Sequence, residues 1–454
     1  MSKKKKKKPH AKPTGNKPTV PNIGKAPMHA TAHSPAKKTR ERTYAEIAGW
    51  SVLVFLLYFG YRIIVLTWPN PSLSAFLPRF SNYAAFHGLD YSMGFLPRVL
   101  SGQILSFFAE PPFTREALAA YLIIVYIIAY GLFSIIIGTM IEKALSKKNY
   151  LMALFPLLFI FAPASVWFRS FSVILFDSLL LIFALCAFLS VKNKKLMWFV
   201  PVAVCLGITA NSAFMLLFFP LIFALLYYEY IKSGTERVRL VHLIVTTVSA
   251  FAMELYMVWA PFHSDQLAKF SYTDSLRYLE NKIGRALNSF ELWYISTSVF
   301  GKNSAGMPVP SESHYAWLQD WWLQPRFLLI AIIICAPILI FTFTIWWKMA
   351  KGEKGVIKKS PYLLFMLAPL VMFPEFLIFM DIDRLVWGVL LTQALLVVHV
   401  FMADGKQQVF APLAAGKKRW IIYTALFLCI IVPLIVFMNK NLLNPPSYKP
   451  DPFF

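Results

Sequence analysis

Long runs of apolar residues recur along this 454-residue sequence and constrain its fold more than any other feature. Each run reaches about 17 residues or more, which is long enough for an α-helix to cross a hydrocarbon core of about 30 Å. Only 15% of the residues are charged, whereas soluble domains contain about a quarter. The sequence therefore predicts an all-α polytopic membrane protein.

Basic connectors orient the predicted helices. All the strongly basic connectors fall on one side of the membrane, which is the cytoplasmic side by the positive-inside rule. They lie at residues 147–148, 192–195, 232–239, 348–359 and 417–419. The N-terminus is then cytoplasmic and the final NPPSYKPDPFF extracytoplasmic. We predict about eleven transmembrane helices, at residues 46–67, 117–142, 150–167, 173–191, 196–211, 213–231, 240–260, 327–349, 361–379, 385–402 and 420–438.

The first 43 residues differ in composition from the rest of the chain. They hold thirteen Lys or Arg and one Glu, and almost no large apolar side chain. Such a segment cannot bury enough surface to fold, so we predict a disordered tail whose Lys3–Lys8 run contacts the anionic inner leaflet. Without a basic groove carrying aromatics, nucleic-acid binding is excluded. No cleavable apolar segment precedes the first helix, so we do not expect a secretory signal peptide. We expect an integral protein of a plasma membrane, of bacterial type.

The four cysteines fall inside predicted membrane helices and not at the spacing of metal ligands; they are Cys186, Cys205, Cys335 and Cys429. We interpret them as small apolar core residues. No cofactor is indicated, although a divalent metal is left open. The predicted organisation is the tail 1–43, a membrane module 44–326 and a C-terminal helical part 327–454.

Two long extracytoplasmic loops, at 68–116 and 261–326, are rich in aromatic residues. In the first loop, Asp90 and Tyr91 occupy a Gly-flanked turn before a helix that we expect to begin at Pro97, with Arg98 in its first turn. Asp90 either forms the turn and caps the helix or serves as a functional carboxylate near Arg98. Arg98 either extends to lipid headgroups or binds an anionic substrate group.

The second loop predicts one amphipathic interfacial helix over residues 271–293, capped by Thr273 or Asp274. Its apolar face comprises Leu276, Leu279, Ile283, Leu287 and Phe290. Its charged face comprises Arg277, Lys282, Arg285 and Glu291. The spacing indicates a helix lying on the outer surface.

Ionisable residues gather at the predicted outer ends of several membrane helices, where they are costly to bury and mark functional sites. They are Arg169, Asp177, Glu254, Glu375, Asp381, Asp383 and Arg384. For three of these residues a structural role is the alternative. Asp383 and Arg384 could form a local salt bridge, and Glu254 a protonated interhelical hydrogen bond.

The predicted plan begins with one membrane helix and a long outer loop with an acidic residue, and continues with six further helices and a second long outer loop. This plan resembles the GT-C superfamily of membrane glycosyltransferases. The resemblance covers about residues 45–330. The resemblance implies a polyprenyl-linked sugar donor and sugar transfer on the extracytoplasmic face. It also implies a catalytic acidic residue in the first outer loop, which by position corresponds to Asp90. Asp177 is comparable to the polar or acidic residues that family members carry at the outer ends of later membrane helices. GLDYSMGFLPRVLSG also looks like segments of bacterial cell-surface polysaccharide membrane proteins.

The corresponding hypothesis assigns the general base to Asp90. Arg98, Arg384 and Arg169 bind the donor phosphate, and Asp383 and Glu375 orient the acceptor or Arg384. The remaining predicted substrate-binding residues are Tyr91, Asp177, Glu254 and Asp381.

Three other functions fit the same residues. The first is a polysaccharide polymerase or ligase acting on lipid-linked oligosaccharides, and the second is a lipid-linked-sugar transporter or flippase. The third is a non-catalytic assembly subunit. Against a transporter, the sequence shows no internal repeat, and its charges lie high rather than at the membrane midplane.

Overall fold

The computed structural model describes residues 35–67, 84–161, 177–302, 306, 325–377 and 382–403, and a few residues between 420 and 431. Within these ranges the chain is helical and forms no β-strand, which confirms the all-α prediction. It divides into two units, Met1–Arg42 and Thr43–Phe454. All contacts reported below lie within the second unit.

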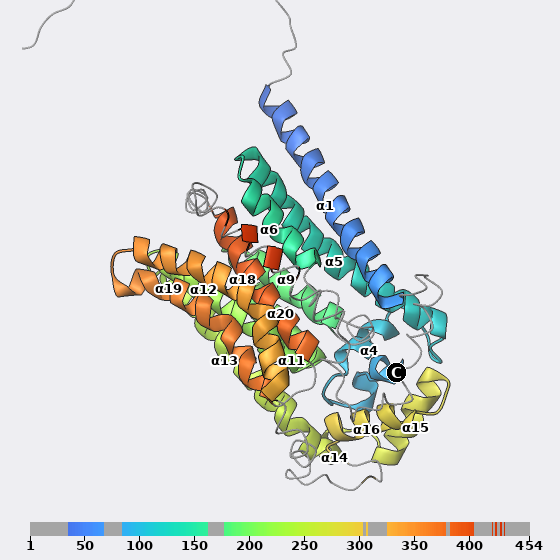
Figure 1. The fold of residues 1–454 in the computed structure, drawn as a ribbon. Coiled ribbons are helices and arrows are strands. Elements are labelled where there is room, and N and C mark those ends of the chain that lie inside the picture. Colours follow the sequence, from blue (N-terminus) through green and yellow to red (C-terminus); the bar gives the residue numbers. More distant parts are fainter. Residues whose placement is uncertain are drawn as a thin grey trace, which may run out of the picture. The chain divides into compact units, whose positions relative to one another are not determined.

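The first half of the chain contains two very long helices, several short ones and the apolar helices of the core (Figure 1). The elements are α1 (Pro35–Thr67), α3 (Ala84–Gly88), the 3₁₀-helix η2 (Tyr91–Met93), α4 (Leu100–Ser106), α5 (Arg115–Ser146), α6 (Tyr150–Phe161), α9 (Asp177–Val191), α10 (Phe199–Ala210), α11 (Ala213–Leu217) and α12 (Phe219–Lys232). The predicted disordered tail was too long, because α1 already begins at Pro35 and its KKTRER segment favours helix.

The second half alternates long helices with a group of short ones. The elements are α13 (Arg237–Trp259), η3 (Ala260–His263), α14 (Ser264–Leu267), α15 (Tyr272–Ile283), α16 (Ser289–Ser298), α18 (Pro325–Gly352), α19 (Val356–Leu367), the 3₁₀-helix η4 (Ala368–Leu377) and α20 (Ile382–Met402). The short helices α14, α15 and α16 lie at the same end of the unit as α4 (Figure 1).

Among the described residues, four helical segments are long and apolar enough to cross a membrane: Glu116–Ser146, Arg237–Leu267, Ile332–Gly352 and Val356–Phe373. Each overlaps a predicted span, and the set is compatible with a membrane protein. The predicted total of about eleven is not confirmed. The apolar helices Asp177–Val191, Phe199–Ala210 and Val386–Met402 are shorter, and the predicted span 213–231 is divided between α11 and α12.

The long helices pack against one another around aromatic and aliphatic side chains. Helix α10 contacts α9 and α13, α12 contacts α13 and α19, and α18 contacts α19 and α20. A buried amide links the last group: Trp346 Nε1 donates to Gln393 Oε1 at 2.8 Å, and Gln393 Nε2 donates to the Phe365 carbonyl at 2.7 Å. Such satisfied polar contacts fix the register of α18, α19 and α20 without an unpaired buried group.

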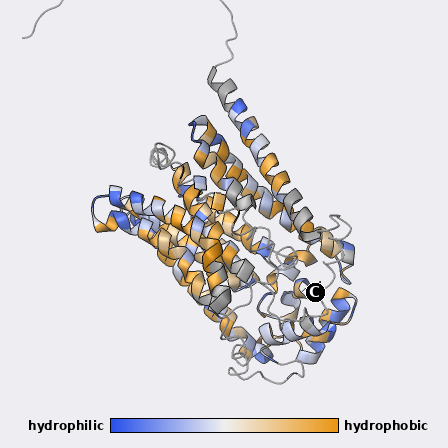
Figure 2. Ribbon diagram, in the orientation of Figure 1, coloured by the Kyte–Doolittle hydropathy of each residue, from blue (hydrophilic) through white to orange (hydrophobic). Residues whose placement is uncertain are grey.

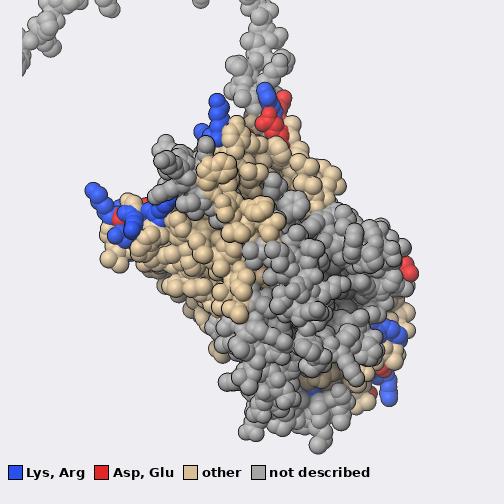
Figure 3. All heavy atoms as spheres, in the orientation of Figure 1, with Lys and Arg blue, Asp and Glu red and all other residues tan. Residues whose placement is uncertain are grey.

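Apolar side chains cover much of the surface of the long helices, as a lipid environment requires. On α13, Ile244, Val248, Leu255 and Val258 are all exposed. Figure 2 shows apolar residues along the long helices, whereas the short helices near α15 are mixed. On the face drawn in Figure 3, the described Lys, Arg, Asp and Glu side chains gather at the top and left of the view and at its lower right edge, and the described surface next to the upper groups is uncharged.

Candidate functional site

The two predicted outer loops meet in a short antiparallel bridge between Gly94 and Ala268. The amide of Phe95 donates to the Leu267 carbonyl at 3.2 Å, and that of Lys269 donates to the Met93 carbonyl at 2.8 Å. Gly94 has a φ of 118°, and a Cβ there would lie 2.2 Å from the Leu267 oxygen. Only glycine fits, so the sequence itself permits the two segments, far apart in the chain, to join.

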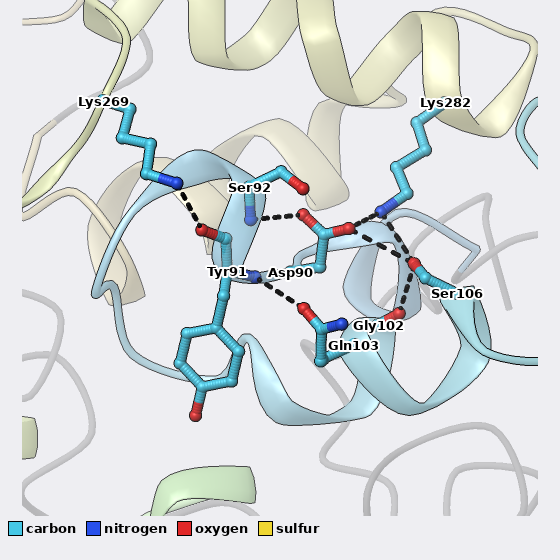
Figure 4. Close-up of polar contacts among 8 residues, drawn as sticks. All are labelled: Asp90, Tyr91, Ser92, Gly102, Gln103, Ser106, Lys269 and Lys282. Carbon is cyan, nitrogen blue, oxygen red and sulfur yellow. Dashed lines mark hydrogen bonds and ion pairs between the residues drawn. The ribbon is translucent and has the colours of Figure 1, made fainter.

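Asp90 sits at the centre of a buried polar cluster that joins these segments (Figure 4). Its Oδ1 accepts from the Ser92 amide at 3.0 Å, which caps the 3₁₀-helix η2. Its Oδ2 lies 3.2 Å from Ser106 Oγ and accepts from Lys282 Nζ of α15. Lys282 Nζ also donates to Ser106 Oγ at 3.1 Å. Both carboxylate oxygens of Asp90 are therefore occupied within the fold.

The charged partner of Asp90 is Lys282, whereas the sequence suggested that Asp90 lies near Arg98. Lys282 was predicted on the charged face of an exposed helix, yet its side chain is buried. Burial lowers the pKa of Lys282 from its usual value, and the hydrogen bond and charge of Asp90 offset part of that shift. A signal was present in the sequence: Lys282 follows Leu279 by three residues, which places it beside the apolar stripe.

The predicted single helix over 271–293 is two helices. Helix α15 ends at Gly284, which has a φ of 71° and occupies the left-handed region at the helix terminus. Its N-cap is Ser271 instead of Thr273 or Asp274, with the side chain accepting from the Asp274 amide. The break matters for the site because it turns α16 back toward the first loop, where Glu291 Oε1 accepts from the Ala85 amide at 3.3 Å.

Helix α16 begins with a second buried ion pair. Asn288 and Glu291 form a reciprocal capping box. The Arg285 guanidinium donates to both oxygens of Glu291 at 2.8 Å. The charged face predicted for this segment was therefore wrong at Glu291, which is fully buried. Periodicity alone cannot distinguish a solvated charge from one paired inside the fold.

Arg98 is the strained residue of the site. It has a φ of 65°, in the left-handed region that non-glycine residues rarely occupy. The helix predicted from Pro97 therefore begins only at Leu100, as α4. The Arg98 guanidinium lies 4.7 Å above the Tyr294 ring, and its Nη1 is buried with no hydrogen-bond partner among the described residues. Strain together with an unused buried donor is typical of a ligand-binding residue.

Glu254, on α13, faces the same region. The charge of Arg98 acts on its carboxylate, and its Oε2 is buried with no hydrogen-bond partner in the part of the chain that the structure describes. The hydroxyl of Tyr256 donates to the Phe95 carbonyl, and the Tyr91 ring lies 6.1 Å from that of Phe95.

Burial also raises the pKa of Tyr91. We call Tyr91, Arg98, Glu254, Tyr256 and Tyr294 the Arg98 cluster. It combines a cation, a carboxylate and three phenols from both loops and from α13, so it can bind a polar ligand that carries an anionic group.

The structure thus brings Arg98 and Glu254 within electrostatic reach of each other, places Tyr91 beside Phe95, and places Asp90 in the ion pair with Lys282. Asp177 is buried at the start of α9. Arg169 and Asp381 lie outside the described residues. Glu375, on η4, and Asp383 and Arg384, on α20, lie where side chains are not described. The predictions for these five positions therefore stay predictions. Tyr256 and Tyr294 were missed, because neither is ionised and neither stands out from a sequence rich in tyrosine.

The described residues contain no group of three or more His, Cys, Asp or Glu side chains that could hold a metal ion. No family model, no curated protein and no solved structure matches the chain. Its function has to be argued from the Arg98 cluster itself.

Proposed function

We propose that this protein is a membrane glycosyltransferase that moves a sugar from a polyprenyl-phosphate-linked donor to an acceptor at the extracytoplasmic face. One observation carries the proposal. Arg98 is held in a strained conformation, and its buried Nη1 has no hydrogen-bond partner among the described residues; the same holds for Oε2 of Glu254, on whose carboxylate the charge of Arg98 acts. Buried polar atoms are nearly always satisfied, so this pair favours a bound polar substrate.

Arg98 suits the phosphate of the donor. A guanidinium is always charged and presents a planar set of donors that match phosphate oxygens. The Tyr294 ring beneath it fixes the plane of the guanidinium. When the bond between the sugar carbon and the phosphate oxygen breaks, the oxygen keeps the electron pair, and Arg98 stabilises the charge that develops there.

Glu254 is the carboxylate that we favour as general base. It would take the proton of the acceptor hydroxyl as that oxygen forms its bond to the sugar carbon. The earlier hypothesis gave this role to Asp90, and that assignment stays a prediction. The contacts of Asp90 argue for a positioning role, since Lys282 and Ser92 occupy its oxygens, whereas no described residue hydrogen-bonds to Oε2 of Glu254.

The surroundings suit a lipid-linked sugar. Tyr91 and Tyr256 offer apolar ring faces and hydroxyl groups, the combination that orients small polar ligands. Glu254 belongs to the candidate membrane-spanning segment Arg237–Leu267, near the end that meets the two loops. A polyprenyl chain could then remain in the bilayer while its phosphate and sugar reach the cluster.

The test is sugar transfer by purified protein in liposomes that contain radiolabelled polyprenyl-phosphate sugars. We expect the wild type to transfer label, Arg98→Lys to be slower by about a hundredfold, and Glu254→Gln to be slower by about 10²–10⁴-fold. Arg277→Lys is the matched control, because the Arg277 side chain is 72% exposed on α15. Every variant must keep the wild-type unfolding temperature.

Two results would contradict parts of the proposal. If Asp90→Asn abolishes transfer at unchanged stability while Glu254→Gln retains it, the base is Asp90. If the wild type transfers no label from any donor in the pool, the glycosyltransferase assignment is wrong, and translocation of lipid-linked sugars is measured next in the same liposomes.

A further inference from the structure

A second polar site lies on the first turns of α13, toward the other end of this helix from Glu254. Arg239, His242 and Thr246 follow one another at spacings of three and four residues, which places them on one helix face. Arg239 is 8% exposed, and His242 and Thr246 are fully buried. We call these three residues the α13 polar row.

Part of the polar row lacks a partner among the described residues. Both ring nitrogens of His242 and Oγ1 of Thr246 are buried and have no hydrogen-bond partner there. Nε and Nη1 of Arg239 also lack a hydrogen bond, but they form ion contacts, Nη1 with Glu229 Oε2 at 3.2 Å and Nε with Glu236 Oε2 at 3.7 Å. Three partnerless buried polar atoms beside a buried guanidinium favour a polar partner from outside the described residues.

A partly exposed tryptophan lies against the row. The indole of Trp198 packs edge-on against the His242 ring, with centroids 4.0 Å apart, and Trp198 is 55% exposed. Beside it, Lys194 donates to Glu236 at 2.6 Å, which lowers the pKa of Glu236 below its usual value. The connector between α9 and α10 therefore covers the row, and a modest movement of Trp198 would open it.

The charges around this opening favour an anion. The two connectors at this end, residues 192–198 and 232–237, carry Lys192, Lys194, Lys195, Lys232 and Arg237 against the single acid Glu236. All five basic side chains are exposed. They are also the connectors that the positive-inside rule places in the cytoplasm. A negatively charged ligand would be attracted here before it reaches Arg239.

The depth of the row matches a phospholipid rather than a free anion. The segment Arg237–Leu267 is a candidate membrane span, and Thr246 lies about 14 Å along the helix from its start. The row thus runs from the headgroup level toward the acyl region. Val202, Val241 and Val245 are exposed on α10 and α13 nearby, and they offer an apolar surface for acyl chains.

We propose that the α13 polar row binds the headgroup of an anionic phospholipid of the membrane leaflet at this end. Arg239 and His242 donate to the phosphate oxygens, and the Thr246 hydroxyl donates to a glycerol ester carbonyl deeper in the membrane. Trp198 lies over the headgroup. This site is separate from the Arg98 cluster, and neither proposal depends on the other.

The test measures the unfolding temperature of the purified full chain in detergent as lipid is added. We expect dioleoylphosphatidylglycerol to raise it in a saturable way and dioleoylphosphatidylcholine to leave it unchanged. His242→Leu and Arg239→Gln should each weaken the apparent affinity for phosphatidylglycerol by about tenfold, because each removes a hydrogen bond to a charged group. Soluble glycerol 3-phosphate should give no shift.

His263→Leu is the matched control, because His263 stacks on Trp259 at 4.1 Å outside the polar row; its affinity should equal that of the wild type. If Arg239→Gln does not fold, His242→Leu decides alone, since its ring nitrogens lack partners in the described structure. Equal shifts in His242→Leu and wild type would overturn the site. Equal shifts with both lipids would overturn the anionic ligand, and an equal shift with glycerol 3-phosphate would overturn the lipid.

Discussion

The buried pair of Asp90 and Lys282 gives the sharpest quantitative prediction. Replacing Lys282 with Met removes the cation and leaves the Asp90 carboxylate buried at 5% side-chain exposure without its main partner. Breaking a buried ion pair from one side costs about 3–5 kcal/mol. We expect the contact between the two outer segments to be weakened by that amount, while the long helices remain folded.

Hydrogen exchange of the bridge amides measures this effect directly. The amides of Phe95 and Lys269 are protected only while the two segments are joined. A loss of 3–5 kcal/mol corresponds to exchange that is faster by about two to almost four powers of ten. Replacing both partners, Asp90→Asn with Lys282→Met, should restore exchange to within about tenfold of the wild type, since no unpaired charge is then buried.

A surface pair provides the control. Lys302 contacts Asp265 at 2.5 Å, but Asp265 is 77% exposed in its side chain. Lys302→Met should therefore change the stability by less than about 1 kcal/mol. Wild-type exchange rates at Phe95 and Lys269 in the single Lys282→Met variant would refute the reasoning, as would a double variant that is no more protected than the single one.

Three further predictions concern the same region. Gly94→Ala should weaken the bridge by about 1–3 kcal/mol, because its Cβ would lie 2.2 Å from the Leu267 oxygen; unchanged exchange at the bridge would contradict this. Glu291→Gln should destabilise α16 by about 1.5–3 kcal/mol, seen as faster exchange of its amides, because Arg285 loses a charged acceptor. Burial raises the pKa of Tyr91 above its usual value, so at alkaline pH the unfolded chain releases a proton that the folded form keeps, and stability should fall as pH rises. The Tyr91→Phe variant should lack that part of the fall in pH-dependent unfolding, and an identical fall would argue against it.

The long helices could be predicted because their signal is continuous. Residues 117–142 form one apolar run without a breaker, and the structure has α5 over Arg115–Ser146. The same reasoning did not locate the break within residues 213–231, where the chain turns at Phe218 between α11 and α12, although Pro220 in the first turn of α12 marks it. Hydropathy reports where a chain is apolar, and it does not report whether the backbone is straight.

The candidate site could be predicted only in part. Glu254 was identified because an ionisable residue in a membrane helix is costly and therefore conspicuous, and Arg98 because it follows Asp90 in the first loop, in the first turn of an expected helix. The positive φ of Arg98 was not predictable, because arginine carries no local preference for that conformation. The pairing of Asp90 with Lys282 joins residues 192 positions apart, and no single sequence contains the register that brings such segments together.

That separation has a consequence for how the protein is made. A ribosome adds about 5–20 residues per second, so Asp90 emerges roughly 10–40 seconds before Lys282, which lies 192 residues later in the chain. During that interval the carboxylate has no lysine to neutralise it and has to stay in water or in the headgroup layer. The first outer segment can therefore close only after α13 and α15 have been delivered. A nascent chain that stalls before residue 282 would present an open, charged segment that a membrane protease could recognise and remove.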